Sequence, residues 1–366
     1  MPRPVLIAAL SGRALAYAVR RSGGRCVVFD LFADDDTQAL ADRCRRLRHG
    51  ADGFDRDALI EAVADAAEGA SGFVYGAGLE HDPALLAAIS RRVPLLGNGA
   101  ETVAAVKDPL RFAALLARLG LPHPPTRLQA PRRGAWLSKR EGGSGGTHIT
   151  PLTNGRATPS HYAQRRLEGD AVSALFVADG RRARVIGHTR QWCHPAADAP
   201  FRYGGAAGPL SPAPHLVAAI AAACEAIATA TGLVGLNSLD LLVADGNFHI
   251  LEVNPRPGAT LDVFATLPLW DWHCAGVASR LADVRPASGA MHGAEILYAP
   301  ARLLIPAAFA WPSWTADRSP AHSVIEAEAP VCTVTAVGPE LGELRATLAR
   351  RAALLLRRLS AGAVAA

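Results

Sequence analysis

The end of one apolar run carries three polar side chains that are costly to bury without a partner. In "FHILEVNPRPG", residues 248–258, a carboxylate, an amide and a guanidinium occur at Glu252, Asn254 and Arg256. Such groups are buried only when an opposite charge, a metal ion or hydrogen-bonding partners satisfy them. Oxygen ligands suit a hard metal ion, and a guanidinium suits phosphate or carboxylate oxygens.

A second carboxylate on the preceding strand extends this pattern. Alternate residues of a strand share a face, so Glu252 and Asn254 point the same way. A three-residue loop at 245–247 sets Asp240 directly across from Glu252, whereas a two-residue loop puts the two carboxylates on opposite faces. Facing carboxylates repel unless a cation lies between them. We therefore expect Asp240, Glu252 and Asn254 to bind Mg²⁺, with Mn²⁺ as an alternative. A solvated hairpin face is the other interpretation of Asp240 alone.

Two lysines remain among 38 basic residues, Lys107 and Lys139. Where arginine replaces lysine elsewhere, a remaining lysine indicates a need for a compact ammonium, although chance survival is the alternative. Lys139 precedes the glycine-rich segment 142–146, whose backbone N–H groups could wrap phosphate oxygens. The segment is not a Walker loop, because no GK[ST] follows it, and an ordinary hairpin turn is the alternative.

Over residues 1–98 the sequence alternates apolar, strand-like runs with helical segments. This pattern predicts a parallel, doubly wound α/β domain, and its strand ends near Gly12, Gly76, Gly78 and Glu80 should line a crevice. The expected strands are 4–10, 25–32, 72–78 and 93–99, and the expected helices are 11–23, 59–69 and 83–92.

The rest of the chain reads as a strand-rich α+β region. Asp108 and Pro109 should cap a helix that runs to Leu119. An apolar helix over 215–232 and the hairpin 236–254 follow, and a basic amphipathic helix is expected over 339–358. The predicted boundaries are an N-terminal domain at 1–100, a small lobe at 101–168, a large lobe at 169–285 and a strand-rich C-terminal region at 286–366 that ends in a helix.

The order of these features resembles the ATP-grasp superfamily of carboxylate–amine ligases. The resemblance rests on a lysine, a glycine loop, a "QRRLEG" linker at 164–169, an aspartate on one hairpin strand and "LEVNPRPG" on the other. It covers residues 100–285 and implies an ATP-grasp fold after an N-terminal Rossmann-like domain, of α/β and α+β class. It also implies that ATP and Mg²⁺ lie between two lobes, and that a carboxylate is phosphorylated and then attacked by an amine.

The resemblance also implies a role for each motif residue. Lys139 would hold the α- and β-phosphates, and Arg256 would face the acyl phosphate, so these two are the candidate catalytic residues. Lys107 lies near the family's first lysine, although it precedes Asp108 where related sequences read Asp-Lys. The other expected nucleotide contacts are Gly143, Ser144, Gly145 and Gly146 at the phosphates, Gln164 at the adenine amino group, Arg166 and Leu167 at the ring edge, and Asp170 at the ribose.

The second-lobe loop at 187–209 is the candidate substrate site. Arginine binds carboxylates through two parallel hydrogen bonds, so Arg190 and Arg202, with Tyr203 and Gly258, could seat an amino acid such as glutamate. A polar surface loop is the alternative. The whole layout loosely resembles ligases of the tyramine–glutamate type from methanofuran and methylofuran synthesis. A carboxylase of the biotin-carboxylase or purine-synthesis type and a non-catalytic nucleotide-binding regulator stay open.

Composition and charge argue against several other classes of protein. The net charge of +5 is dispersed, which argues against nucleic-acid binding. No apolar run reaches the roughly 18 residues of a membrane span, and the N-terminus lacks a secretory pattern. Six scattered cysteines are typical of reduced thiols in a cytoplasmic protein. The expected partners are ATP and small carboxylate and amine substrates, with a homodimer as an open arrangement.

Overall fold

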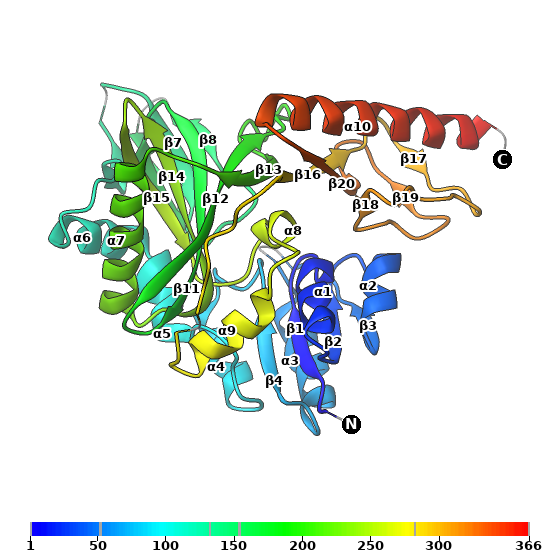
Figure 1. The fold of residues 1–366 in the computed structure, drawn as a ribbon, viewed down its shortest axis with the longest axis horizontal. Helices are drawn as coiled ribbons and strands as arrows, with labels where there is room; N and C mark the ends of the chain where they lie inside the picture. Colours follow the sequence, from blue (N-terminus) through cyan, green and yellow to red (C-terminus); the bar gives the residue numbers. More distant parts are fainter. Residues whose placement is uncertain (1, 51–52, 132, 153–154, 282, 365–366) are drawn as a thin grey trace.

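The computed structural model describes residues 2–50, 53–131, 133–152, 155–281 and 283–364 of the chain. Three larger sheets organise the described residues: a parallel sheet near the N-terminus, a small antiparallel sheet, and an eight-stranded antiparallel sheet that reaches the C-terminal region (Figure 1). Two two-stranded sheets, β6-β9 and β17-β19, accompany them. The mixed α/β and α+β class agrees with the sequence prediction.

The N-terminal sheet has four parallel strands in the order β3-β2-β1-β4, as the alternating pattern predicts. Two elements were not expected, α2 and the edge strand β3, because the sequence of β3, "RCRR", is charged rather than apolar. The expected strand at 93–99 is reduced to one isolated bridge between Leu95 and Phe73. The elements are β1 (Val5–Ala8), α1 (Arg13–Arg21), β2 (Cys26–Asp30), α2 (Asp35–Leu40), β3 (Arg43–Arg46), α3 (Arg56–Ala67), β4 (Gly72–Tyr75) and α4 (Pro83–Ser90).

Two consecutive helices lead into the small lobe. The carboxylate of Asp108 accepts hydrogen bonds from the N–H groups of Leu110 and Arg111, both at 3.0 Å, so it caps the second helix as predicted. The small sheet runs in the order β5-β10-β7-β8, and β6 pairs with β9 beside it. The elements are α5 (Ala100–Lys107), α6 (Pro109–Arg118), β5 (Thr126–Arg127), β6 (Gln129–Ala130), β7 (Trp136–Arg140), β8 (Thr150–Leu152), β9 (Gly155–Arg156) and β10 (His161–Arg165).

The large sheet has the order β15-β14-β11-β12-β13-β16-β20-β18. Side chains alternate between the two faces of the sheet along its inner strand β11: Phe176 packs with α7, while Leu175 and Val177 pack with α9 and the N-terminal domain. The elements are β11 (Asp170–Asp179), β12 (Ala183–Cys193), β13 (Tyr203–Leu210), α7 (Pro214–Thr231), β14 (Val234–Ala244), β15 (Asn247–Asn254), α8 (Thr260–Val263) and α9 (Leu269–Val277).

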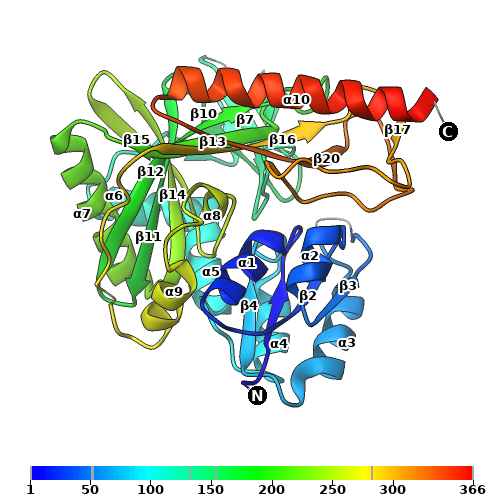
Figure 2. The same ribbon diagram turned by 45° about the vertical axis from the view of Figure 1, so that its right-hand side comes forward.

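The C-terminal region continues this same sheet, because β16 pairs with β13 and β20 with β16. The long helix α10 (Leu341–Val364) lies along the region (Figure 2). Its buried leucines follow a helical spacing and pack on the sheet, which explains the amphipathic pattern without a membrane surface. The remaining strands are β16 (Met291–Tyr298), β17 (Leu303–Leu304), β18 (Thr315–Ala316), β19 (Val324–Ile325) and β20 (Pro330–Gly338).

One helix does meet the length and composition of a membrane span, contrary to the expectation that no segment is long enough. It is α7, with 18 residues and a mean hydropathy of 1.3. Ile220, Cys224 and Ile227 on this helix are fully buried in the core of the large lobe. Packing on the sheet therefore accounts for its apolar face.

Candidate active site

The β14–β15 hairpin brings Asp240 and Glu252 together by a different route from the predicted one. Ala244 pairs with Asn247, so the loop is the two-residue turn Asp245-Gly246, both with positive φ, and the expected three-residue loop is wrong. The register then shifts by one residue between Asp240 and Leu241, and Asp240 pairs with Glu252 after all. An extra residue in β15 is a β-bulge, which compensates for the shorter loop.

The two carboxylates lie in a buried polar cluster. Asp240 accepts hydrogen bonds from the Ser173 hydroxyl (2.6 Å) and from Asn254 Nδ2 (2.9 Å). Burial and the charge of Glu252 raise the pKa of Asp240. Burial alone would raise the pKa of Glu252 too, but the nearby Lys107 and Lys139 lower it to about 2. The cluster therefore holds negative charge that a cation would stabilise.

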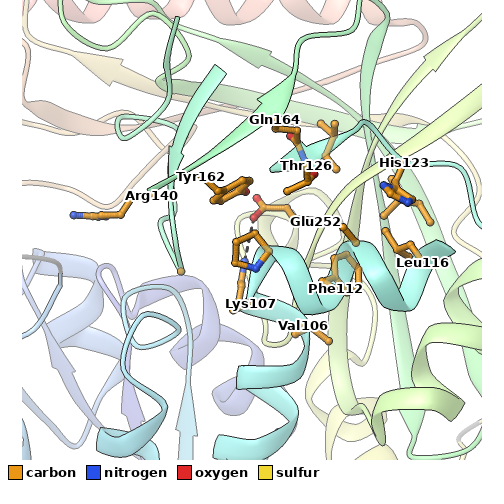
Figure 3. Close-up of a pocket in the computed structure, with 15 residues that line it drawn as sticks. Val106, Lys107, Phe112, Leu116, His123, Thr126, Arg140, Tyr162, Gln164 and Glu252 are labelled. Carbon is orange, nitrogen blue, oxygen red and sulfur yellow. Dashed lines mark hydrogen bonds and ion pairs between the residues drawn. The ribbon is translucent and has the colours of Figure 1, made fainter. Parts of the chain in front are cut away.

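Lys107, at the end of α5, supplies part of that positive charge. Its Nζ lies 3.2 Å from Glu252 Oε2 and 3.0 Å from Asn254 Oδ1. Figure 3 shows the side chain of Lys107 directed at Glu252, with Tyr162 nearby and Phe112 and other α6 side chains on the opposite wall. The enclosed volume at this spot, about 30 Å³, is near the size of a water molecule and far too small for a nucleotide.

Two carboxylates and an amide oxygen are a donor set that suits Mg²⁺, which takes one or two carboxylates and completes its shell with water and phosphate oxygens. Within the described ranges no group of three or more His, Cys, Asp or Glu side chains is arranged to bind a metal on its own. The donor set therefore fits a metal ion whose coordination shell is completed by nucleotide oxygens. Asp240, Glu252 and Asn254 stay the predicted ligands.

Lys139 on β7 is almost fully buried, with 4% of the residue exposed. Its Nζ lies 3.3 Å from Gln164 Oε1 on the neighbouring strand β10. Burial would lower the pKa of Lys139, but Tyr162, Glu252 and Asp240 raise it overall, so the ammonium stays charged. The pairing of β7 with β10 thus brings two of the predicted nucleotide contacts side by side.

Arg256 is held by a residue from the N-terminal domain. Its Nε donates to Glu80 Oε1 at 2.6 Å, and Glu80, 1% exposed, also accepts the N–H groups of Gly78 and Leu79. Burial alone would raise the pKa of Glu80, but Arg256 and Lys107 lower it. A Cβ at position 258 would lie 2.4 Å from Arg256 Nη1, so Gly258 leaves the room that this arginine needs.

Residues of the N-terminal domain also hold the turn that carries Arg256. The hydroxyl of Tyr75 and Nδ2 of Asn98 both donate to the carbonyl oxygen of Pro255, at 3.3 and 2.9 Å. Asn98 also donates to Asn237 Oδ1 on β14, at 2.8 Å. The sequence predicted that strand ends of the first domain line a crevice, but not that Glu80, Tyr75 and Asn98 support the catalytic candidate. No local pattern signals pairs so far apart in the chain.

A cavity of about 500 Å³ joins these groups into one site. This volume lies within the range of small-molecule and cofactor sites. Arg166 and Leu167 of the linker line it as predicted, and so do His148 and Thr260, which the sequence did not single out. The Thr260 hydroxyl is buried and has no hydrogen-bond partner in the part of the chain that the structure describes. Other predicted residues on the wall are Lys139, Ser144, Gly145, Gly146, Gln164, Tyr203, Asp240, Glu252, Asn254 and Arg256.

The glycine loop covers part of this cavity through contacts that only glycine permits. Gly142 and Gly146 both have positive φ. A Cβ on Gly142 would lie 2.5 Å from the His81 backbone, and one on Gly146 would lie 2.0 Å from the carbonyl oxygen of Phe201. The Tyr203 N–H donates to the carbonyl oxygen of Gly145 at 2.9 Å. Gly143 packs beside the His148 ring. The loop thus lies against both the N-terminal domain and the large lobe.

Three predicted contacts have other partners. Asp170 and Arg190 form an ion pair with each other, and neither lines the cavity. The guanidinium of Arg202 stacks 3.7 Å from the Tyr298 ring and pairs with Glu328 at 2.8 Å. These contacts engage the side chains that were predicted to bind the ribose and a substrate carboxylate. The arrangement argues against those roles for Asp170, Arg190 and Arg202, whereas Tyr203 keeps its place on the cavity wall.

Comparison with known proteins identifies the fold of this region. Residues 106–260 match the family model described as ATP-grasp domain, which agrees with the resemblance that the motifs carry. The large chain of carbamoyl phosphate synthase from Myxococcus xanthus is 28% identical over 196 residues, which is 46% of this chain and 18% of that protein. The chain thus spans less than a fifth of the length of this relative.

Solved structures extend the likeness to nearly the whole chain. L-amino acid ligase from Bacillus licheniformis superimposes with a TM-score of 0.68 at 13% identity, covering 99% of this chain and 98% of its own. The biotin carboxylase domain of 2-oxoglutarate carboxylase from Hydrogenobacter thermophilus, solved with MgADP and bicarbonate, gives 0.69 at 11% identity, covering 91% and 86%. At such identities the likeness shows the fold alone, and it agrees with the predicted ATP-grasp fold.

Proposed function

We propose that this protein is an ATP-dependent carboxylate–amine ligase. The observation that carries the proposal is one 500 Å³ cavity in which acidic side chains of the β14–β15 hairpin lie with Lys139 and Arg256, while Lys107 contacts Glu252 beside the cavity. This arrangement suits a nucleoside triphosphate with its metal, because phosphate charge needs both fixed cations and metal-binding carboxylates. The ATP-grasp fold supports the same class.

Each part of the cavity has a task in this proposal. The linker around Arg166 and Leu167 would hold the base, and Lys139 with the glycine loop would hold the phosphates. Asp240 and Glu252 would bind Mg²⁺, which supplies charge stabilisation at the phosphates. Arg256, oriented by Glu80, would donate hydrogen bonds to the acyl phosphate, where a fixed guanidinium offsets developing charge.

The reaction runs in two balanced steps. An oxygen of the substrate carboxylate attacks the γ-phosphorus of ATP, the bond to the β-phosphate oxygen breaks, and ADP leaves. The nitrogen of the amine then attacks the acyl carbon, and inorganic phosphate leaves. Starting from an ammonium ion, one proton ends on the phosphate and one is released. Exclusion of water by the covering loop would protect the acyl phosphate from hydrolysis.

The finer parts of the sequence prediction remain predictions. Glutamate as the carboxylate substrate and a role in methylofuran-type cofactor synthesis rested on the loop at 187–209 and on overall layout. The ion pairs of Arg190 and Arg202 weaken the glutamate argument, since both guanidinium groups already have carboxylate partners. The carboxylate substrate is better sought among acids that fit beside Tyr203, Thr260 and Arg256.

Hydroxylamine trapping tests the first step without knowledge of the amine. The purified protein is incubated with ATP, Mg²⁺, hydroxylamine and each of the common L-amino acids in turn, and hydroxamate, ADP and phosphate are measured. We expect equal amounts of the three products with at least one acid. AMP and pyrophosphate instead, or phosphate release that depends on bicarbonate alone, would contradict the proposal, and the second result would favour a carboxylase.

A matched pair of variants links the activity to the site. Arg256→Ala should abolish hydroxamate formation. Arg302→Ala removes an exposed arginine that pairs with Glu326 on the surface, and it should behave as the wild type. If both variants keep full activity, the reaction does not occur in this cavity.

A further inference from the structure

A second cavity, of about 240 Å³, adjoins the first where the N-terminal domain, the large lobe and the C-terminal region meet. Ala77, Tyr203 and Ala259 line both cavities, so the two share a wall. Pro257 and Gly258, directly after the catalytic candidate Arg256, also line the second cavity. None of the residues assigned to ATP or Mg²⁺ lines this second cavity. Its position beside the turn that carries Arg256 suits a second substrate.

The polar wall of the second cavity is acidic. Arg13 on α1 forms two parallel hydrogen bonds with Asp262 (2.6 and 2.7 Å) and two with Asp317 (both 3.0 Å). Asp36 lies 3.9 Å from Arg13 Nε. Among the described residues Arg13 is the one cation within ion-pair distance of these three carboxylates. Every nitrogen of its guanidinium already donates to them, so no donor pair is left for a carboxylate ligand.

A fourth carboxyl group near this wall, that of Asp34, forms no ion pair with the residues that the structure describes. Asp34 is 4% exposed, and its side chain accepts no hydrogen bond from the residues that the structure describes. Burial and the charges of Asp317, Asp30 and Asp36 raise its pKa to about 8, while Arg13 opposes this shift. A carboxyl group with this pKa is mostly protonated at pH 7, so the negative charge of the wall comes from Asp36, Asp262 and Asp317, which share one arginine. The hydroxyls of Ser11 and Thr333 also donate to Asp317, but they carry no charge. These half-buried carboxylates are therefore short of positive charge, which a cationic ligand would supply.

The rest of the second cavity is apolar. Leu15, Leu261 and Ile296 are among the side chains on its wall. A bare metal ion does not suit this surface, and no set of three metal-ligating side chains was found in the described ranges. An organic cation fits both parts, with its charge beside the carboxylates and its carbon atoms against the leucines and the isoleucine.

We propose that the second cavity binds the amine substrate as a small organic ammonium ion. Its charged end lies at Asp262 and Asp317, its apolar body lies on Leu15, Leu261 and Ile296, and Tyr203 separates it from the nucleotide cavity. The assignment of this cation as the nucleophile rests on the proposed ligase function. The binding of a cation rests on the cavity alone.

Matched probes test the sign of the charge directly. Three carbon skeletons are used, butyl, cyclohexylmethyl and 2-phenylethyl, each as the amine, as the alcohol and as the carboxylate with one additional carbon. Binding is measured by calorimetry on the full chain at pH 7 without ATP. We expect at least one amine to bind about tenfold or more tightly than its alcohol, the effect of one ion pair of moderate strength. No preference for any amine, or a preference for carboxylates, would overturn the proposal.

Variants of the second cavity test whether the preference for an amine over its alcohol arises there. Asp262→Asn removes one carboxylate and leaves the pair of Arg13 with Asp317, and the amine-to-alcohol preference should fall several-fold. Asp271→Asn changes an exposed aspartate on α9 and is the matched control. Asp317→Asn is the second variant if Asp262→Asn does not fold. Full preference in a folded variant of either residue would show that the cation binds elsewhere.

Hydroxylamine separates this proposal from the proposed function. It is small and uncharged at neutral pH, so it can reach an acyl phosphate without the acidic wall. Under the proposal, Asp262→Asn lowers the yield of amide relative to hydroxamate, and Asp271→Asn leaves that ratio unchanged. If amines bind but no acid yields a hydroxamate, the ligase function fails and the cation site stands. If hydroxamate forms but amines show no preference, the cation site fails alone.

Discussion

The two charged clusters of this protein differ in their balance. At and directly around the nucleotide cavity three cations face three carboxylates, and each cation lies near at least one of them. In the second cavity several carboxylates share one arginine. Folding alone favours balanced buried charge, so an imbalance that persists indicates a ligand of the missing sign. The balanced cluster consists of Lys107, Lys139, Arg256, Glu80, Asp240 and Glu252, and the unbalanced one of Arg13, Asp34, Asp36, Asp262 and Asp317.

This comparison gives the two clusters different functions. A balanced cluster can admit a metal and a triphosphate together, because the incoming charges nearly cancel. An acidic cluster next to an apolar wall can attract only a cation and should repel the ATP phosphates. ATP and the amine would then bind to different cavities because of their opposite charges, and both cavities lie beside Arg256. The predictions below test each side of this contrast.

The largest effect is expected at Arg256. Removal of one well-placed electrostatic donor typically lowers turnover by roughly a hundred- to a thousand-fold. Arg256→Ala should therefore lose ligation while it binds Mg·ATP nearly as the wild type does, because Lys107 and Lys139 remain. Calorimetric titration with ATP beside a phosphate-release assay measures both quantities. Full turnover with an accepted acid would make Arg256 a structural residue.

A smaller loss of turnover is expected at Glu80, which positions Arg256 without touching substrate. Glu80→Gln keeps the shape but leaves the guanidinium without its charge partner, and loss of one member of a buried pair costs about 3–5 kcal/mol of stability. We expect kcat to fall and KM for ATP to stay unchanged. Glu80→Asp should recover part of kcat, since it restores the charge. A change in KM alone would contradict a positioning role.

Lys139 should affect binding rather than the chemical step. Lys139→Ala leaves the phosphate charge unbalanced and should raise KM for ATP steeply. Lys139→Arg should also weaken binding, because the planar fork does not replace a compact ammonium beside Gln164. Steady-state kinetics at varied ATP, with circular dichroism to confirm folding, measures this. Unchanged KM in both variants would return Lys139 to a structural role in the small lobe.

Residue types predicted more of the site than spacing did. Asp240, Glu252, Asn254, Lys139 and the glycine loop meet as expected, because metal and phosphate chemistry admits few side chains. The hairpin loop was assigned the wrong length, since period-two alternation does not reveal a compensating bulge. The contact of Glu80 with Arg256 was not predictable, because 176 positions separate them.

Residue type also misled the prediction in one place. Arginine suits carboxylate substrates, but Arg190 and Arg202 reach carboxylates of the protein itself. A single sequence does not tell an arginine that awaits a ligand from one that already has a partner. Arg13 shows the reverse case: it lies in a helix after a Ser-Gly turn, where nothing local announces the two aspartates that bind it. Such tertiary partners become visible only in the folded chain.

The smallest effect is expected at Asp34, and it concerns stability rather than catalysis. The pKa of Asp34 in the folded protein is raised to about 8, from an ordinary value of 3.8. Between these two values the unfolded chain has lost the proton that the folded chain retains, so this group lowers stability increasingly as pH rises from about 4 to 8. Asp34→Asn removes that cost. The variant should melt close to the wild type at pH 5 and roughly a few degrees higher at pH 8.

The same measurement reports on the cation site. An amine that binds beside Asp317 should reduce the repulsion among Asp34, Asp36 and Asp317, and it should therefore stabilise the wild type more at pH 8 than at pH 5. Thermal melting of the wild type and Asp34→Asn, each with and without 2-phenylethylamine, measures this. In Asp34→Asn the pH dependence of the stabilisation should shrink. A wild type whose melting temperature does not fall relative to the variant between pH 5 and 8 would show that Arg13 and the backbone already compensate these carboxylates, and the contrast between the two clusters would then disappear.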